Sequence, residues 1–239
     1  MRKLRAIQIF GYLCFVGFLF IVSLLVYQLW ISNYFSDRAA TDAREELLLS
    51  WNRPTTNALK PSTPVSASTT TEPQKAELVT NQKPFALIYI PRINDDVWGL
   101  PIFEGVSSKQ LNSGIGHYPQ SASLGEEGNF SLFGHRTSNG QPFSNIQKLR
   151  VGDQVIIETK DFWYVYQLEF DRIVKPNAMW VTSSERVPEL GITESDPYNV
   201  ITLITCEPRY STSQRWVWWG ALQSILPHSN TPIDANAQP

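Results

Sequence analysis

The chain has 239 residues and a formal net charge of −2 at neutral pH, from 20 lysines and arginines against 22 aspartates and glutamates. That length supports one or at most two domains. Because three of the positive charges lie within the first five residues, the remainder of the chain sums to −5, which argues against nucleic acid or an anionic lipid surface as the main partner.

The first predicted element is an apolar segment, residues 6–31, which contains no Asp, Glu, Lys or Arg. It is longer than the ~20 residues that a helix needs to cross a bilayer. The basic residues at 2–5 predict a cytoplasmic N-terminus and place the rest of the chain outside. A cleavable signal peptide is the alternative, but its apolar core would span about 7–15 residues before a small-x-small site. We therefore expect a retained single-pass anchor in the cell membrane.

The segment after the anchor changes character twice. Residues 37–51 are typical of a helix that continues outward from the membrane. Residues 53–83 contain four prolines and a Ser/Thr-rich run, a composition that cannot bury enough apolar surface to fold. The sequence predicts a semi-extended tether there, able to span several tens of ångströms and reach into a cell-wall layer.

From about residue 84 the composition becomes globular, and short β-rich runs alternate with Gly, Pro, Asn and Asp. This pattern predicts an all-β barrel or sandwich. One short helix is expected at 142–149, and the polar residues after 226 predict a flexible tail. The predicted strands are 85–90, 97–103, 130–133, 154–158, 162–174, 200–205 and 216–222.

The chain is thus expected to have five parts. They are a cytoplasmic flank at 1–5, the transmembrane anchor at 6–31, a juxtamembrane helix and linker at 32–83, a globular domain at 84–226, and a tail at 227–239.

Cys206 is the only cysteine outside the apolar segment, where Cys14 is expected to pack as a small side chain. It ends a strand-like run, and because Pro208 cannot continue a central strand, we place the thiol at a strand exit that solvent can reach. With no disulfide partner outside the membrane, the choice is between an inert buried cysteine and a nucleophile. We favour the nucleophile.

Two further residues lie at strand edges and complete a set for thiol-based acyl transfer. His135 follows the run 130–133 and can exchange protons, while Arg215 opens the last strand and can stabilise an oxyanion. The structural alternatives are an ordinary histidine and a surface charge paired with Glu207. His117, in a turn-rich loop, is the second choice as base and is otherwise expected to line the substrate site.

Together these residues resemble the sortase family over roughly 84–226. The motifs that carry the resemblance are Gly128-Asn129, Gly134-His135-Arg136, Thr202-Leu203-Ile204-Thr205-Cys206 and Arg215. The details are most similar to class E sortases of high-GC Gram-positive bacteria: Gly116-His117-Tyr118-Pro119, His135-Arg136-Thr137 before Pro142-Phe143, and Thr205-Cys206 with Pro208 and Gln214-Arg215.

The resemblance implies a closed eight-stranded sortase β-barrel with short helices and a cysteine transpeptidase. We expect no cofactor and no zinc site, because no cluster of His, Cys and carboxylates has zinc-like spacing. Some sortases depend on calcium, but no acidic cluster in this sequence requires it. Such enzymes cleave a C-terminal Leu-Pro-x-Thr-Gly sorting signal, with Ala in the second place for class E, between Thr and Gly. Cys206 would form the thioacyl intermediate, His135 would protonate the leaving amine, and Arg215 would hold the oxyanion. A peptidoglycan-precursor amine would then accept the secreted protein.

The resemblance also implies a place for the signal on the enzyme. Tyr118 would face its second position, Thr205 would line the groove, and a long loop at 177–198 would wall it. Two other functions remain open on the sequence alone. One is a sortase that polymerises pilins through a pilin lysine, and the other is a catalytically idle wall-binding module.

Overall fold

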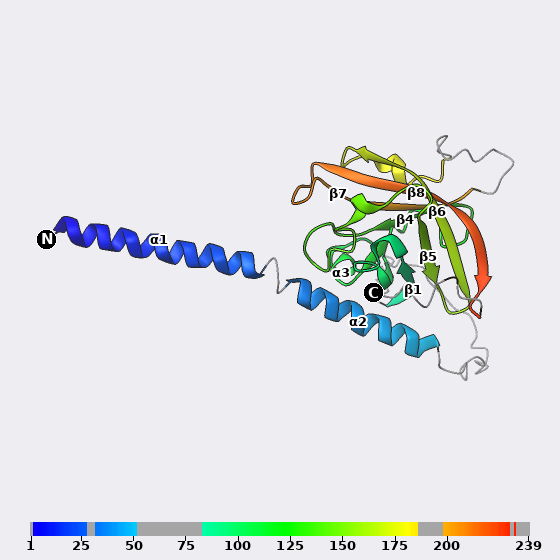
Figure 1. Cartoon of the computed structure of the whole chain (residues 1–239), viewed down its shortest axis with the longest axis horizontal. Coiled ribbons are helices and arrows are strands. Elements are labelled where there is room, and N and C mark those ends of the chain that lie inside the picture. Colours follow the sequence, from blue (N-terminus) through cyan, green and yellow to red (C-terminus); the bar gives the residue numbers. More distant parts are fainter. Residues whose placement is uncertain (1, 28–31, 52–82, 186–197, 230–231, 233–239) are drawn as a thin grey trace, which may run out of the picture.

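The computed structural model describes residues 2–27, 32–51, 83–185, 198–229 and 232, which form two N-terminal helices and a β-barrel (Figure 1). The helices are α1 (Arg2–Val26) and α2 (Ser32–Trp51), with one further turn of helix, α3 (Ser108–Leu111). The strands are β1 (Pro84–Tyr89), β2 (Trp98–Glu104), β3 (Ile115–His117), β4 (Gly128–Phe133), β5 (Gln154–Glu158), β6 (Phe162–Val174), β7 (Asn199–Glu207) and β8 (Gln214–Pro227).

The eight strands close into a barrel in the order β1-β2-β3-β4-β7-β8-β6-β5, which confirms the predicted barrel. Two neighbouring pairs, β2–β3 and β4–β7, are parallel, and the others are antiparallel. Strand β3 was not expected, because the sequence around His117 predicts a turn-rich loop. With only three residues, β3 is too short to show the alternation by which a strand is recognised.

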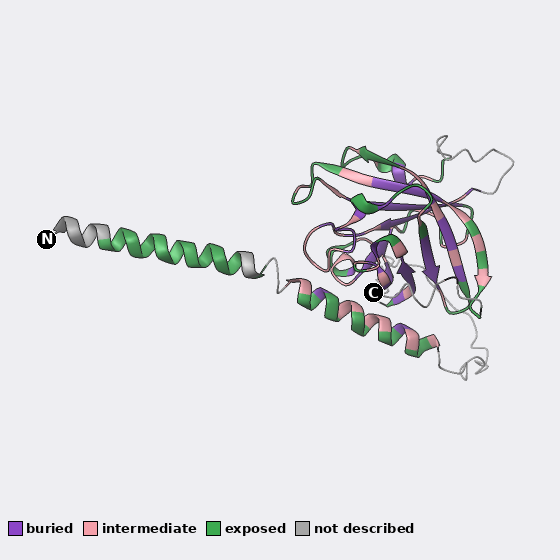
Figure 2. Ribbon diagram, in the orientation of Figure 1, coloured by how far each residue is buried: buried purple, intermediate pink, exposed green. Residues whose placement is uncertain are grey.

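The barrel is filled by apolar side chains from all its walls and covered by apolar clusters outside (Figure 2). The tryptophans of β8 point to both the inside and the outside of the barrel, because successive side chains of a strand alternate between its two faces. Trp218 packs into the interior with Leu203, whereas Trp219 lies in an outer cluster with Tyr198. The aromatic run of β8 therefore joins two apolar layers.

Helix α2 packs against the outside of the barrel, along β1 and β2 (Figures 1 and 2). Leu47 is buried in the outer cluster that includes Tyr89. Gly99, with a φ of 66°, lies beneath α2, where a Cβ would come within 2.9 Å of the Arg44 guanidinium carbon. The predicted helix is present, but it does not lead away from the domain as a spacer.

Helix α1 extends away from the barrel, and its described side chains between residues 8 and 24 are exposed (Figure 2). Within the described residues, no helix has both the length and the apolar character to cross a membrane. The predicted anchor at 6–31 also includes residues 28–31, which lie outside the described part of the chain. It stays a prediction.

Two local expectations are corrected. The helix expected at 142–149 is only a 3-10 turn, η3 (Ile146–Lys148). Phe143, Ile146 and Leu149 of the expected helix are buried at a spacing of three, which suits a 3-10 turn and not an α-helix. His228, assigned to a flexible tail, is held to the barrel: its backbone amide donates to Asp161, and its ring stacks on Trp163 with centroids 5.3 Å apart.

The loop expected at 177–198 is only partly described. Its first residues form the 3-10 turn η4 (Met179–Thr182), and residues 186–197 lie outside the described residues.

Candidate active site

The parallel pairing of β4 and β7 brings Cys206 and the segment after β4 to the same edge of the barrel. Phe133 is opposite Ile204, and the Gly134 amide continues the ladder to the Ile204 carbonyl at 3.1 Å. Because parallel strands leave a sheet at one edge, residues 135 and 206 become neighbours. Gly134 is needed there, since a Cβ would lie 2.8 Å from the Phe143 ring.

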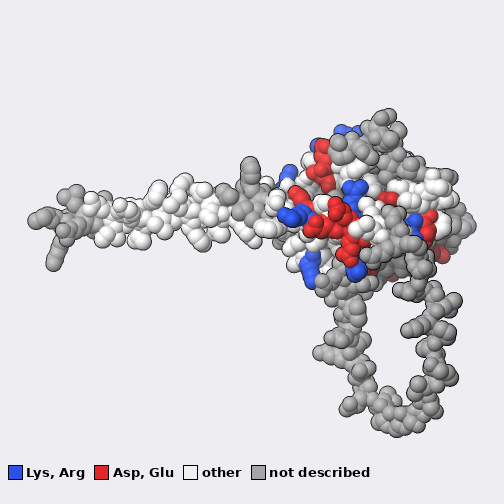
Figure 3. Space-filling model, turned by 90° about the horizontal axis from the view of Figure 1, so that it is seen from below, with Lys and Arg blue, Asp and Glu red and all other residues white. Residues whose placement is uncertain are grey.

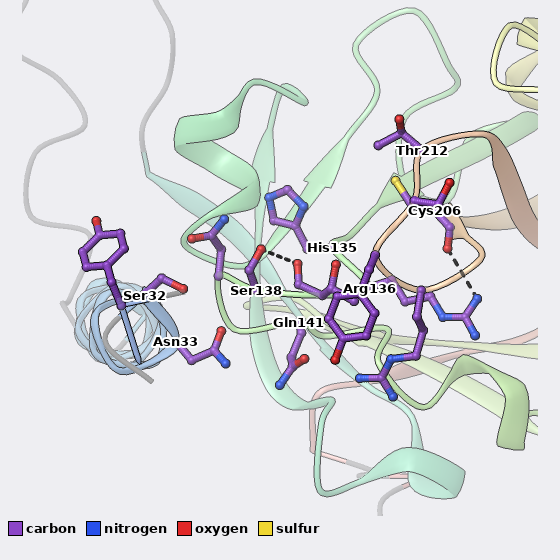
Figure 4. Close-up of a pocket in the computed structure, with 14 residues that line it drawn as sticks. Ser32, Asn33, His135, Arg136, Ser138, Gln141, Cys206 and Thr212 are labelled. Atoms are coloured by element: carbon purple, nitrogen blue, oxygen red, sulfur yellow. Dashed lines mark hydrogen bonds between the residues drawn. The ribbon is translucent and has the colours of Figure 1, made fainter. Parts of the chain in front are cut away.

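Cys206 and His135 line a cavity of about 730 Å³ at this edge (Figure 4). In Figure 4 the sulfur of Cys206 points to the side on which the imidazole of His135 lies. The turn at 138–141 and the β7–β8 loop at 209–212 form further walls. Another wall was not expected from the sequence: Ser32 and Asn33, in the first turn of α2, also line the cavity.

His135 is held by Asn112, which follows α3. The Nε2 atom of His135 lies 3.1 Å from the Asn112 Oδ1 atom, an acceptor, so Nε2 carries the proton and Nδ1 is the nitrogen left for proton transfer. Burial lowers the pKa of His135 below its ordinary value because the charged imidazolium loses hydration. The neutral imidazole is therefore favoured in the free protein at neutral pH.

Arg215 lies directly across from Cys206 in the β7–β8 ladder, so both side chains leave the same face of the sheet. Its guanidinium does not line the cavity, however. The Nη1 atom donates to the backbone carbonyls of Thr212 at 3.1 Å and Gln214 at 2.8 Å. In this conformation Arg215 holds the β7–β8 loop and keeps Nε and Nη2 as further donors.

The three residues expected to bind substrate do not line this cavity. Thr205 is 2% exposed, and its hydroxyl donates to the Gly134 carbonyl beneath the nucleophile. The ring of half-buried Tyr118 lies against Phe133, with centroids 5.9 Å apart. The structure therefore does not place these two side chains where the cavity could present them to a ligand.

His117 belongs to a different part of the barrel. It is buried at the end of β3, where its Nδ1 atom lies 2.8 Å from Glu104 Oε2 and its ring stacks on Phe130. It lines a second cavity, of about 550 Å³, together with the β3–β4 loop and the β5–β6 turn. The structure thus separates His117 from Cys206, and His135 is the histidine that shares a cavity with the thiol.

Two residues near the reacting groups received no role from the sequence. Asn112 lies 23 positions before His135, and no local pattern links the two. Arg136 follows His135 directly and is buried, with its guanidinium against the end of β7. The one local signal for Arg136 was its place next to His135 in the Gly134-His135-Arg136 motif.

The comparisons with known proteins agree with this arrangement. Residues 88–223 match the family described as the sortase domain. Sortase SrtE2 of Streptomyces coelicolor is 31% identical over 225 residues, which cover 91% of this chain and 82% of that protein. Sortase SrtE1 of the same organism is 35% identical over 63% of this chain and 44% of its own length.

Solved structures give the same result. Sortase E from Streptomyces avermitilis superposes with a TM-score of 0.56 at 35% identity, covering 63% of this chain and 95% of that one. Sortase E1 from Streptomyces coelicolor, solved with a tripeptide in its active site, gives a TM-score of 0.57 at 32% identity, covering 65% and 97%. With a thiol and an imidazole on one cavity of an eight-stranded barrel, and neighbours of class E, the chain belongs to the sortase family of cysteine transpeptidases.

Proposed function

We propose that this sortase cleaves a Leu-Ala-x-Thr-Gly or Leu-Pro-x-Thr-Gly sorting signal between Thr and Gly and transfers the protein to an amine of the cell-wall precursor. The observation that carries the proposal is that Cys206 and His135 share the wall of one cavity of about 730 Å³. That volume is within the range of about 300–1,000 Å³ typical of ligand sites. The tripeptide bound to the similar sortase E1 supports a peptide substrate.

The chemistry divides into two acyl transfers. His135 takes the proton of the Cys206 thiol, and the resulting thiolate attacks the Thr carbonyl carbon and forms a C–S bond. The C–N bond to Gly breaks as the imidazolium of His135 delivers that proton to the departing amine. The acceptor amine then attacks the thioester carbonyl, a new amide forms, and the thiolate of Cys206 leaves. His135 takes the proton that the attacking amine loses and returns it to the thiolate, which restores the starting state.

Arg215 is proposed to stabilise the tetrahedral intermediates of both steps. It starts opposite Cys206 in the ladder, and its Nη1 contacts leave Nε and Nη2 free to turn toward an oxyanion. A preorganised donor of this kind contributes about 2.7–4 kcal/mol in other acyl-transfer enzymes. To take this role, the Arg215 side chain needs only to rotate, because its backbone already lies opposite that of Cys206.

We also propose that residues 6–31 anchor the enzyme in the cell membrane, with the N-terminus cytoplasmic and residues 84–226 outside as the catalytic domain. No charged residue occurs in that segment, and residues 8–24 of α1 present a continuous uncharged surface on the face seen in Figure 3. Its exposed side chains include Phe10, Leu13 and Phe20, and apolar surfaces of this extent are typically covered by lipid or protein.

The position of the cavity favours an acceptor at the membrane surface. Tyr27, directly after α1, lines the cavity together with the start of α2. If α1 spans the bilayer, the reacting thiol is close to the outer surface, where a precursor carried on a lipid would present its amine.

The test uses the full chain, purified in detergent, with a Leu-Ala-x-Thr-Gly peptide and an amine acceptor. We expect two products, the released Gly fragment and the acyl group joined to the acceptor amine, both identified by mass. Cys206→Ala and His135→Ala should abolish both, and hydroxylamine should intercept the thioester of the wild type. The proposal is wrong if wild type and Cys206→Ala give the same product yield.

A further inference from the structure

The residue that follows each of the three proposed catalytic residues belongs to a second set of side chains, and one of this set, Arg136, also lines the cavity. Arg136 follows His135, Glu207 follows Cys206, and Trp216 follows Arg215. Because successive side chains of a strand point to opposite faces, Glu207 and Trp216 leave the sheet on the side away from Cys206 and Arg215. We call these three residues the support layer.

Arg136 connects the members of the support layer. It is only 6% exposed, it forms an ion pair with Glu207, and its guanidinium carbon lies 5.0 Å from the centroid of the Trp216 ring. The Trp216 ring is itself fixed, since its Nε1 atom donates to Asp171 Oδ2 on β6 at 2.7 Å. Arg136 thus ties the segment after β4 to β7 and β8.

The same side chain reaches the nucleophile. Arg136 Nη1 donates to the carbonyl oxygen of Cys206 at 3.4 Å. Burial lowers the pKa of Arg136, the like charge of Arg209 acts in the same direction, and the charge of a Cys206 thiolate opposes them. The contact with the Cys206 carbonyl places the guanidinium beside the residue that carries the sulfur, whereas Arg215 is turned toward the β7–β8 loop in this conformation.

We propose that Arg136 is a positioning residue that fixes the end of β7 beneath Cys206 and supplies a permanent positive charge that favours its thiolate, with Glu207 and Trp216 holding the guanidinium in place. The inference rests on the proposed function only in that Cys206 is the nucleophile. A thiolate is the reactive form of cysteine, and a nearby cation stabilises it. Arg suits the role because it stays protonated even when buried.

The test measures the reactivity of Cys206 without any substrate. In the full chain carrying Cys14→Ala, the sulfur displaces iodide from iodoacetamide and forms a C–S bond, and the rate follows the fraction of thiolate. Arg136→Met removes the positive charge and leaves Glu207, so we expect alkylation about tenfold slower. Glu207→Gln removes the negative charge and leaves Arg136, so alkylation should become faster.

The opposite effects of the two variants on the alkylation rate distinguish a charge effect from structural damage. A merely structural role predicts that both variants disturb the strand end and change the rate in the same direction, and that result would overturn the proposal. Arg92→Met and Asp153→Asn are matched controls, because Arg92 and Asp153 form an ion pair at 2.8 Å away from the cavity. Both controls should leave the alkylation rate within about twofold, the scatter of surface substitutions.

Two further measurements keep the proposal falsifiable. If thermal unfolding shows that Arg136→Met does not fold, Arg136→Lys retains the charge and should alkylate within about threefold of wild type, and Glu207→Gln must still be faster. In peptide transfer, Arg136→Met should lower kcat about 100-fold and raise KM by a smaller factor, as expected for a displaced nucleophile. If the enzyme does not cleave the peptide but shows the two opposite effects on alkylation, the proposed substrate is wrong and the role of Arg136 is supported.

Discussion

The contact between His135 and Asn112 decides which ring nitrogen is available for catalysis. We expect Asn112→Ala to lower kcat about tenfold or more, because general acid–base catalysis depends on a positioned proton and an unheld ring samples unproductive orientations. KM should change little, since Asn112 does not line the cavity. Steady-state kinetics of peptide transfer provides the measurement.

Asn112→Asp is the matched control, because it keeps an acceptor at the same place. It should retain more of the wild-type kcat than Asn112→Ala does. Equal kcat values for wild type and Asn112→Ala would show that the contact has no part in catalysis.

Burial of His135 also makes the stability of the protein depend on pH. Its pKa is lowered in the folded protein and stays near the ordinary value of about 6.5 when unfolded, so between these values the unfolded chain binds more protons. The contribution is fully present above about pH 6.5 and is lost as the pH falls toward the folded pKa. Thermal unfolding at pH 7.5 and 5.0 should show a larger loss for wild type than for His135→Asn.

The comparison of wild type with His135→Asn isolates the effect of His135, since the two proteins share all other titrating groups. An identical change of Tm with pH in both would mean that the folded His135 binds its proton as readily as the unfolded one does.

At the scale of the elements, the packing of α2 on the barrel can be tested directly, because one leucine near the end of this helix is buried and another is exposed. Leu47 is 6% exposed against the barrel, while Leu49 is 62% exposed on the same helix. Leu47→Ala should lower the free energy of unfolding by about 2–5 kcal/mol, as other buried Leu→Ala changes do. Leu49→Ala should cost less than about 0.5 kcal/mol.

Urea unfolding of the full chain measures both values. If the two variants lose equal stability, α2 is not packed on the barrel in solution, and its first turn then forms no wall of the cavity.

The strands show what a sequence can and cannot predict. The limits of β5 and β6 were predicted to the residue, because clear runs of β-branched and aromatic side chains end at Gly, Asp or Pro. The positions of His135 and Cys206 followed from strand ends in the same way. What the pattern could not provide was which elements meet across long distances in sequence. Neither the docking of α2 nor the Asn112 contact has a local signal, since each depends on the closed barrel.

At the scale of the whole molecule, the proposed membrane anchor at residues 6–31 can be tested by adding charge to α1. Leu13→Arg combined with Phe20→Arg puts two charges in the middle of the proposed anchor, each costing about 2.5–3.5 kcal/mol in a bilayer centre. We expect the wild type in the membrane pellet after a carbonate wash and the double variant mostly in the supernatant. Tyr34→Arg, at an exposed site of α2, is the control and should pellet like the wild type.

A wild-type chain that washes free of the membrane would contradict the proposed anchor, while leaving the sortase fold and its cavity untouched.

The docked α2 changes what the Pro/Ser/Thr-rich segment can do. Trp51, where α2 ends, lies against the ring of His228 on the barrel, and Lys83, where the described chain resumes, is paired with Glu46 at 2.9 Å. The described residues at the two ends of the segment 52–82 therefore lie on the same side of the domain. Lengthening a segment whose ends are held in this way costs only slightly more free energy. If residues 6–31 span the bilayer as proposed, the docked α2 holds the thiol at a height above it that does not depend on the length of the segment 52–82.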